Sequence, residues 1–271
     1  MQVYFLIIMF ILGACLGSFL CCQARRLRLK QTKNQKLGPR SVCLKCDYKL
    51  KWYDNIPILS WILLRGKCRK CHKKIGYAEI ISELGFGFSF LAISSTIDLL
   101  TNMSPLDIVT SVIMLLLIIS LGFLAIYDGI YGELPSFAII ISIVLSMITV
   151  VLNEYNFFLS ADFSFGLLLS RLLSVPLSVA IIGGLYLVLY LISKGKWVGD
   201  GDWLLGVVIG LALGNPWLSL ITLFIANILA CLIMFPFIKK QSSKKIYFGP
   251  FFVVAFIITY TFANFFQSMI Q

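Results

Sequence analysis

Residues 108–127 read IVTSVIMLLLIISLGFLAIY, an apolar stretch of 20 residues without a charge. A helix of that length rises about 30 Å, which matches the hydrocarbon thickness of a bilayer. Hydrophobic residues make up 59% of the 271-residue chain and charged residues 13%, a more apolar balance than soluble domains have. Similar apolar stretches recur at residues 3–22, 80–99, 134–152, 165–192, 203–213, 217–238 and 248–266. The sequence therefore predicts an all-α polytopic membrane protein with about eight transmembrane helices.

The positive charge of the chain is concentrated in one segment. Of the 23 Lys and Arg residues, 16 lie between Arg25 and Lys74, where only Asp47 and Asp54 oppose them. This segment carries +14, and the rest of the chain is slightly negative. A basic loop in a membrane protein marks the cytoplasmic side and contacts anionic lipid. Because the charge is confined to one loop, the composition does not favour a nucleic-acid-binding protein.

The basic loop also sets the expected orientation. With residues 25–78 in the cytoplasm, the N-terminus is outside, and the stretches without Lys or Arg at 98–107, 153–164 and 215–216 fall outside as well. The segments 128–133, 194–196 and 239–245 then fall inside. Residues 203–213 are short and glycine-rich, so a re-entrant segment is an alternative, but only an eight-helix count keeps every basic cluster inside. We divide the chain into a first transmembrane helix (1–24), a cytoplasmic basic domain (25–78) and a membrane-embedded core (79–271).

The cytoplasmic domain contains two Cys-x-x-Cys pairs. Cys43 and Cys46 form the first, and Cys68 and Cys71 form the second. Two such pairs supply the four thiolates of a tetrahedral zinc site, and a metal stabilises a polar domain that is too small for a large apolar core. Two disulfides or a redox pair are the alternatives, and the reducing cytoplasm disfavours disulfides. A closed four-cysteine site implies a structural zinc.

Two acidic positions stand at the cytoplasmic ends of predicted helices. Asp128 follows the stretch 108–127, and the sequence Gly199-Asp200-Gly201-Asp202 precedes the stretch 203–213. Ionisable residues at membrane depth are costly, which makes them candidates for function. Two facing carboxylates share one proton, so that one activates water while the other protonates the scissile carbonyl. The alternative is structural: Asp128 ends a helix at the interface, and Asp200 or Asp202 caps one.

Several motifs occur in the order typical of one protein family. The chain resembles the type IV prepilin peptidases, which are intramembrane aspartyl proteases of the Gly-x-Gly-Asp type. The motifs that carry the resemblance span most of the chain: Gly17-Ser18-Phe19-Leu20, the four cysteines between Cys43 and Cys71, WYDNIPILSW at 52–61, Glu83, Asp128 with Pro135 seven residues later, Gly199–Asp202, and Phe248-Gly249-Pro250-Phe251.

The resemblance implies site residues. It assigns catalysis to Asp128 and Asp202 and leaves Asp200 at the variable position of the motif. It implies supporting roles for six residues of the matched motifs: Glu83, Pro135, Gly199, Gly201, Gly249 and Pro250.

The resemblance also implies an activity. Such an enzyme lies in the bacterial cytoplasmic membrane and cleaves short basic leaders, after a Gly, from prepilins or pseudopilins of type IV pili, type II secretion or DNA uptake. Some members also methylate the new N-terminus with S-adenosylmethionine, although the sequence has no glycine-rich nucleotide fingerprint. A membrane scaffold with a zinc knuckle and a thiol oxidoreductase are the rival functions. The sequence does not indicate an oligomeric state.

Overall fold

The computed structural model describes residues 2–33, 41–43, 45–96, 104–159, 165–238 and 247–269. The chain divides into two compact units, Met1–Ser95 and Thr96–Gln271. Three stretches that bear on the predicted orientation lie outside the described residues: Asp98 with its neighbours, residues 160–164, and the basic segment 239–245.

The described residues form helices, and the predicted all-α membrane fold is confirmed. Within the part of the chain that the structure describes, six helical segments are long and apolar enough to cross a membrane, and there are two shorter apolar helices. The long ones are α1 (Gln2–Lys33), α3 (Ala78–Ser95), α4 (Pro105–Tyr131), α5 (Ser136–Leu159), α9 (Pro216–Ile238), and the run of α6 (Phe165–Val179), η2 (Ala180–Gly184) and α7 (Leu185–Ser193). The two short helices are α8 (Asp202–Leu213) and α10 (Gly249–Thr261), and α11 (Ala263–Ser268) follows α10. The six long segments together with α8 and α10 match the eight predicted apolar stretches in order.

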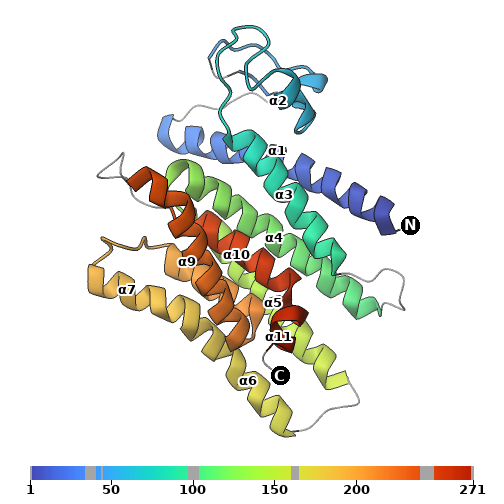
Figure 1. The fold of residues 1–271 in the computed structure, drawn as a ribbon, viewed down its shortest axis with the longest axis vertical. Coiled ribbons are helices and arrows are strands. Elements are labelled where there is room, and N and C mark those ends of the chain that lie inside the picture. The colour runs from blue at the N-terminus through green and yellow to red at the C-terminus, as the bar shows by residue number, and fades with distance from the viewer. Residues whose placement is uncertain are drawn as a thin grey trace. The chain divides into compact units, whose positions relative to one another are not determined.

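The first unit is built on two crossing helices, α1 and α3 (Figure 1). Gly13 and Gly17 lie at the crossing, where an added Cβ would collide with the backbone of Phe86 and Ser82. Small residues let transmembrane helices approach this closely. Helix α1 continues to Lys33, well past the apolar stretch that ends at Cys22, and its final turns therefore carry basic residues.

Between α1 and α3 lies the cysteine loop. It contains a short 3-10 helix, η1 (Trp52–Asn55), and a short α-helix, α2 (Leu59–Leu63). Two isolated antiparallel bridges, Val42 with Lys49 and Lys67 with Lys74, each close a tight turn. Each turn contains one Cys-x-x-Cys pair, so the local fold presents two thiols from each turn.

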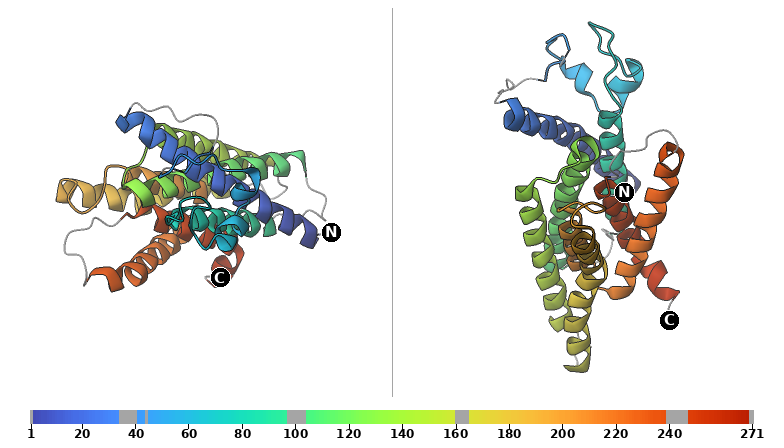
Figure 2. Two further views of the ribbon diagram at one scale, coloured as in Figure 1. Left: turned by 90° about the horizontal axis from the view of Figure 1, so that it is seen from above. Right: turned by 90° about the vertical axis from the view of Figure 1, so that its left-hand side faces the viewer.

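The second unit contains the remaining helices. Helices α4 and α5 lie side by side, as the right-hand view of Figure 2 shows, and α10 packs against α4 and α9. The segment η2 is a π-helix that packs against α8. Gly183 and Gly206 meet there, since a Cβ on Gly206 would lie 3.0 Å from the Cα of Gly183. This close packing fixes the position of α8, whose first residue is Asp202.

Candidate active site and metal centre

The carboxylate of Asp128, near the end of α4, is hydrogen-bonded to the first residue of α10. It lies in the last turns of α4 with 5% of its surface exposed. Its Oδ2 accepts a hydrogen bond of 2.9 Å from the backbone N–H of Gly249, the first residue of α10. Pro250 follows, and its ring suits the first turn of a helix, where no N–H is needed. The partial positive charge at the N-terminus of α10 therefore faces a carboxylate that is 121 residues away in the chain.

Gly249 has no room for a side chain. A Cβ on Gly249 would lie 2.7 Å from Oδ2 of Asp128 and 3.2 Å from its Cγ. Gly129, next to Asp128, faces Pro250, whose Cγ would lie 3.4 Å from an added Cβ. The glycines of both motifs therefore let the end of α4 approach the start of α10.

Asp202 begins α8, and its carboxylate is oriented by its own motif. Its Oδ2 accepts a hydrogen bond of 2.9 Å from the backbone N–H of Gly199. Gly201 lies against Leu134, since a Cβ on Gly201 would be 2.8 Å from the Cβ of Leu134. Leu134 precedes Pro135, whose carbonyl oxygen accepts the N–H of Ala138 in the first turn of α5. The Gly-Asp-Gly-Asp motif thus packs on the connection between α4 and α5.

The two predicted aspartates come together in the structure. Asp202 is close enough to Asp128 for their carboxylates to interact electrostatically. Asp200, the alternative candidate, is exposed and interacts instead with the side chain of Tyr190. The arrangement agrees with the expectation that Asp128 and Asp202 meet at one end of the bundle. Their catalytic role stays a prediction.

Each carboxylate has one oxygen that the described residues leave open. In both aspartates Oδ2 accepts a backbone N–H, and none of the described residues donates a hydrogen bond to Oδ1. A pair of carboxylates arranged in this way can bind a water molecule and a peptide carbonyl between them. That is the requirement for general acid–base hydrolysis.

Tyr186 is a residue near the pair that sequence reasoning missed. It is 4% exposed, packs against Phe248 and Phe252, and interacts electrostatically with Asp202. Tyr186 lies just after η2, and π-helical turns often occur at functional sites, but no sequence pattern distinguishes this tyrosine from others in apolar stretches.

Glu83 is not part of this pair. It lies on α3 in the first unit, 6% exposed, and its Oε2 accepts a hydrogen bond of 2.7 Å from the backbone N–H of Ile58. The predicted supporting residues therefore divide between the two units. Gly199, Gly201, Pro135, Gly249 and Pro250 are in the second unit, and Glu83 holds the cysteine loop in the first.

The four predicted cysteine ligands form one cluster. Their sulfur atoms all lie within 4.8 Å of one another. The Sγ atoms of Cys43 and Cys71 are 3.9 Å apart, and those of Cys46 and Cys68 are 4.0 Å apart. A tetrahedral site with Zn–S bonds of about 2.3 Å places its sulfur atoms about 3.8 Å apart. The four thiols are free cysteines in the structure, and their geometry fits one tetrahedral metal ion.

An ion pair ties the two halves of the cysteine loop together. Arg69, between the second pair of cysteines, donates a hydrogen bond of 2.8 Å to Oδ1 of Asp54. The backbone N–H of Lys51 donates to Oδ2 of the same carboxylate at 3.1 Å. Burial acts to raise the pKa of Asp54, but the hydrogen bonds from Arg69 and Lys51 outweigh it and lower the pKa below its usual range. Asp54 belongs to the motif WYDNIPILSW, so the structure gives this acidic residue a role in loop architecture.

Comparisons with known proteins agree with the motifs. Residues 11–97 match the family described as Bacterial Peptidase A24 N-terminal domain. The prepilin leader peptidase/N-methyltransferase of Myxococcus xanthus is 42% identical over 88 residues, which are 32% of this chain and 25% of the relative. The Vibrio cholerae protein of the same name is 43% identical over 91 residues, 32% of this chain and 36% of the relative. These two alignments thus span about a quarter and a third of the relatives.

Similarity also extends over most of the chain. The prepilin leader peptidase/N-methyltransferase of Stutzerimonas stutzeri is 24% identical over 233 residues, which cover 80% of this chain and 70% of the relative. No solved structure matches the chain. The resemblance inferred from the motifs is therefore confirmed.

Proposed function

We propose that this chain, a relative of the prepilin leader peptidase/N-methyltransferases, is an aspartyl endopeptidase of the bacterial cytoplasmic membrane. It removes a short basic leader from prepilins or pseudopilins by cutting after a Gly at the cytoplasmic face. The observation that carries the proposal is the meeting of Asp128 and Asp202, which come from α4 and α8 and interact electrostatically.

The mechanism follows from the two carboxylates. When they share one proton, the ionised group takes a proton from a bound water, and the water oxygen attacks the scissile carbonyl. The protonated group donates its proton to the carbonyl oxygen. The other group then passes the proton that it took from water to the leaving amine as the C–N bond breaks, and the first group regains its proton from the hydroxyl of the intermediate as the new carboxyl group forms. The hydrogen bonds from Gly199 and Gly249 hold Oδ2 of each aspartate and leave Oδ1 of each available for the reacting groups.

The surroundings of the pair suit the proposed substrate. Glu133 and Asp200 are exposed near the ends of α4 and α8, and with the catalytic pair they make this region acidic. An acidic region attracts a basic leader. A Gly before the cut lets the substrate adopt an extended path close to the carboxylates, because Gly has no side chain.

The test is cleavage of a purified prepilin, with the new N-terminus determined by mass spectrometry. We expect Asp128→Asn and Asp202→Asn each to abolish cleavage while membrane insertion is retained, because either change leaves the pair unable to exchange the shared proton. Wild-type turnover by either variant would overturn the assignment of the pair. Loss of cleavage in both also excludes a purely structural scaffold, since a scaffold has no turnover to lose.

We further infer that Cys43, Cys46, Cys68 and Cys71 bind one structural zinc ion. The four thiols fill a tetrahedral shell, which leaves no position for a substrate or a water. Zinc therefore supplies stability to the loop and takes no part in hydrolysis. Bound zinc in the purified protein also counts against a thiol oxidoreductase, because all four thiols are then occupied as ligands.

A further inference from the structure

Helix α2 of the cysteine loop exposes three large apolar side chains on one face. Leu59, Ile62 and Leu63 are 59%, 55% and 80% exposed. At about 100° per residue, these three positions fall within about 100° of one another around the helix axis. Ser60 and Trp61 lie on the other side of α2 and are partly buried. A helix of a water-soluble domain turns its apolar face toward the core, whereas α2 turns its apolar face away from the protein.

Two hydrogen bonds hold α2 beside the beginning of α3. The backbone N–H of Ile58, the residue before α2, donates to Oε2 of Glu83 at 2.7 Å. The Nε1–H of Trp61 donates to the carbonyl oxygen of Gly76 at 3.1 Å. The ring of Trp61 also lies 5.8 Å from that of Tyr77, measured between centroids. The partly buried side of α2 is therefore attached to the start of α3.

These contacts determine the depth of α2 along α3. Helix α3 begins at Ala78 and is one of the segments that are apolar enough to cross a membrane. Its 18 residues rise about 27 Å, close to the hydrocarbon thickness of about 30 Å, so nearly the whole helix is needed to cross. Glu83 lies five residues beyond Ala78, which is about 7.5 Å along the axis. Because the start of α2 reaches Glu83, it reaches the edge of the bilayer.

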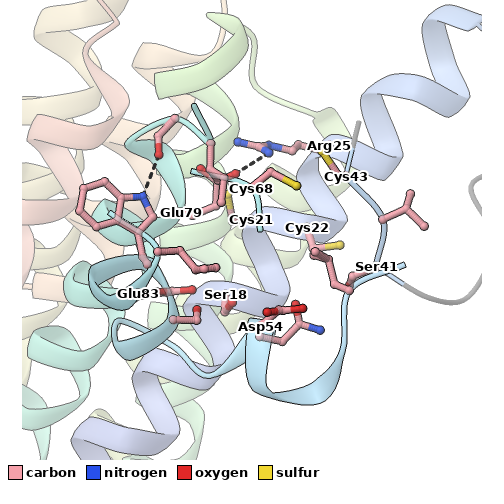
Figure 3. A pocket seen from close by; sticks show the side chains of 18 of the residues that line it. Ser18, Cys21, Cys22, Arg25, Ser41, Cys43, Asp54, Cys68, Glu79 and Glu83 are labelled. Carbon is pink, nitrogen blue, oxygen red and sulfur yellow. Dashed lines mark hydrogen bonds and ion pairs between the residues drawn. The ribbon is translucent and has the colours of Figure 1, made fainter. Parts of the chain in front are cut away.

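A strained turn leads into α2 at this point. Ile58 has φ +64° and ψ −55°, a conformation that a β-branched residue rarely adopts. The N–H of Leu59 reaches the carbonyl oxygen of Pro57 at 2.6 Å, which closes a γ-turn around Ile58. Glu83, which accepts the N–H of Ile58, is 6% exposed and lines a pocket with Ser18 of α1 (Figure 3). The packed helices thus fix the turn, as such strain requires.

Apolar, aromatic and basic side chains border the exposed face of α2. Tyr77, just before α3, and Ile81, in its first turn, are 70% and 66% exposed. Arg65 and Lys67 follow α2 directly and are exposed. Aromatic and aliphatic side chains beside Arg and Lys are typical of segments that lie in a membrane interface, where the apolar groups meet acyl chains and the cations meet phosphates.

We propose that the face of α2 formed by Leu59, Ile62 and Leu63 inserts into the membrane interface, in the leaflet from which α3 enters the bilayer. The hydrocarbon edge of that leaflet covers the three apolar side chains, and its headgroups contact Arg65 and Lys67. A basic loop by itself is attracted to anionic lipid by charge, which salt screens. The apolar face adds an attachment that salt does not screen. This proposal does not depend on the proposed peptidase activity.

The test is photo-crosslinking of the full-length protein in nanodiscs of phosphatidylethanolamine and phosphatidylglycerol, at high salt. A fraction of the lipid has a diazirine at the glycerol end of an acyl chain, so that the carbene marks residues at the hydrocarbon edge. Trypsin cuts after Lys51 and Arg65 and releases α2 on the peptide 52–65. We expect adducts on this peptide at a yield similar to that at the start of α3. The cysteine turn 43–51 should give far fewer, because its described residues include no exposed large apolar side chain.

Leu63→Glu and Leu63→Lys separate apolar insertion from charge. Leu63 is 80% exposed, so neither change should alter the fold or the zinc content. Leu63→Glu should lower the adduct yield on 52–65 by about threefold or more, because a carboxylate avoids the hydrocarbon edge. Leu63→Lys should lower it less, because its ammonium can extend to the headgroups. Lys49→Gln is the matched control: it removes one positive charge from an exposed position of the first cysteine turn and should leave the yield unchanged.

Three results would overturn the proposal. The first is a peptide 52–65 without adducts in samples whose α1 and α3 peptides are labelled. The second is an unchanged yield in Leu63→Glu, or an equal fall in Lys49→Gln, because the charge of the loop and not its apolar face would then hold it at the lipid. The third is a wild-type dimer without adducts on 52–65 that dissociates in Leu63→Glu, which would assign the face to a second copy of the chain.

Discussion

Gly249→Ala tests how Asp128 is positioned, and its effect follows from the geometry of α10. The new Cβ would lie 2.7 Å from Oδ2 of Asp128 and 3.2 Å from both its Cβ and its Cγ. Ordinary contacts between such atoms are about 3.5 Å or longer. Either the start of α10 or the carboxylate must therefore move by about half an ångström or more. Gly249 does not have a positive φ, so alanine causes no backbone strain of its own and the effect is steric.

The displacement weakens the hydrogen bond from Gly249 to Asp128 and turns the carboxylate. A hydrogen bond to a charged group contributes about 1.5–3 kcal/mol, and a catalytic group misplaced by about 1 Å can cost a factor of about 100 in rate. We expect Gly249→Ala to lower the initial rate of leader cleavage by about 10- to 100-fold. Membrane insertion and zinc content should stay at wild-type levels.

The assay is the initial cleavage rate on one prepilin in one detergent, together with a melting curve. Gly85→Ala is the control, because an added Cβ there meets no atom within 4 Å and alanine favours a helix. It should cleave like the wild type. A wild-type rate for Gly249→Ala, with the control also unchanged, would refute the inference that the start of α10 orients Asp128.

Three further outcomes are expected. Asp200→Ala should retain most of the cleavage rate, because this carboxylate is exposed and contacts Tyr190; a dead Asp200→Ala beside an active Asp202→Ala would reverse the assignment. Gly201→Ala should reduce the cleavage rate, because the new Cβ would be 2.8 Å from the Cβ of Leu134. A wild-type rate would show that this contact does not determine the position of Asp202. Elemental analysis should find one zinc per chain, and Cys68→Ser should lose it and lower the melting temperature; protein purified without chelators and free of metal would contradict the zinc site.

The sequence predicts the helices well because each apolar stretch must satisfy its backbone hydrogen bonds within the bilayer. The run 165–192 is an example: its composition predicts one crossing, and the structure has one helical segment there that is long and apolar enough to cross a membrane. The π-helical segment η2 lies within it, and there Gly183 packs on Gly206 of another segment. No local sequence pattern encodes such a contact.

The candidate site also has a part that the sequence predicts and a part that only the structure reveals. Asp128, Asp200, Asp202 and the four cysteines stand out by residue type and spacing, since charges at membrane depth and paired Cys-x-x-Cys turns are rare. The family resemblance was needed to prefer a catalytic role over a structural one and to select Asp202 over Asp200. The contacts that orient them are not local. Gly249 reaches Asp128 across 121 residues, and Tyr186 approaches Asp202 from a different helix, so both partners become visible only in the folded chain.

The two sites obtain rigidity from different sources, and this difference predicts how each fails. Asp128 and Asp202 are fixed by helix ends and by glycines that permit close packing. Their geometry therefore depends on the small volume of these glycines. The cysteine loop has little apolar core, and its described secondary structure is limited to η1, α2 and two isolated bridges. Its geometry therefore depends on the Asp54–Arg69 ion pair, on the hydrogen bond between Glu83 and Ile58 and, as proposed above, on a zinc ion held by the four cysteines. A chelator should consequently disturb the cysteine loop before it disturbs the aspartate pair, whereas adding a methyl group at Gly249 should do the reverse.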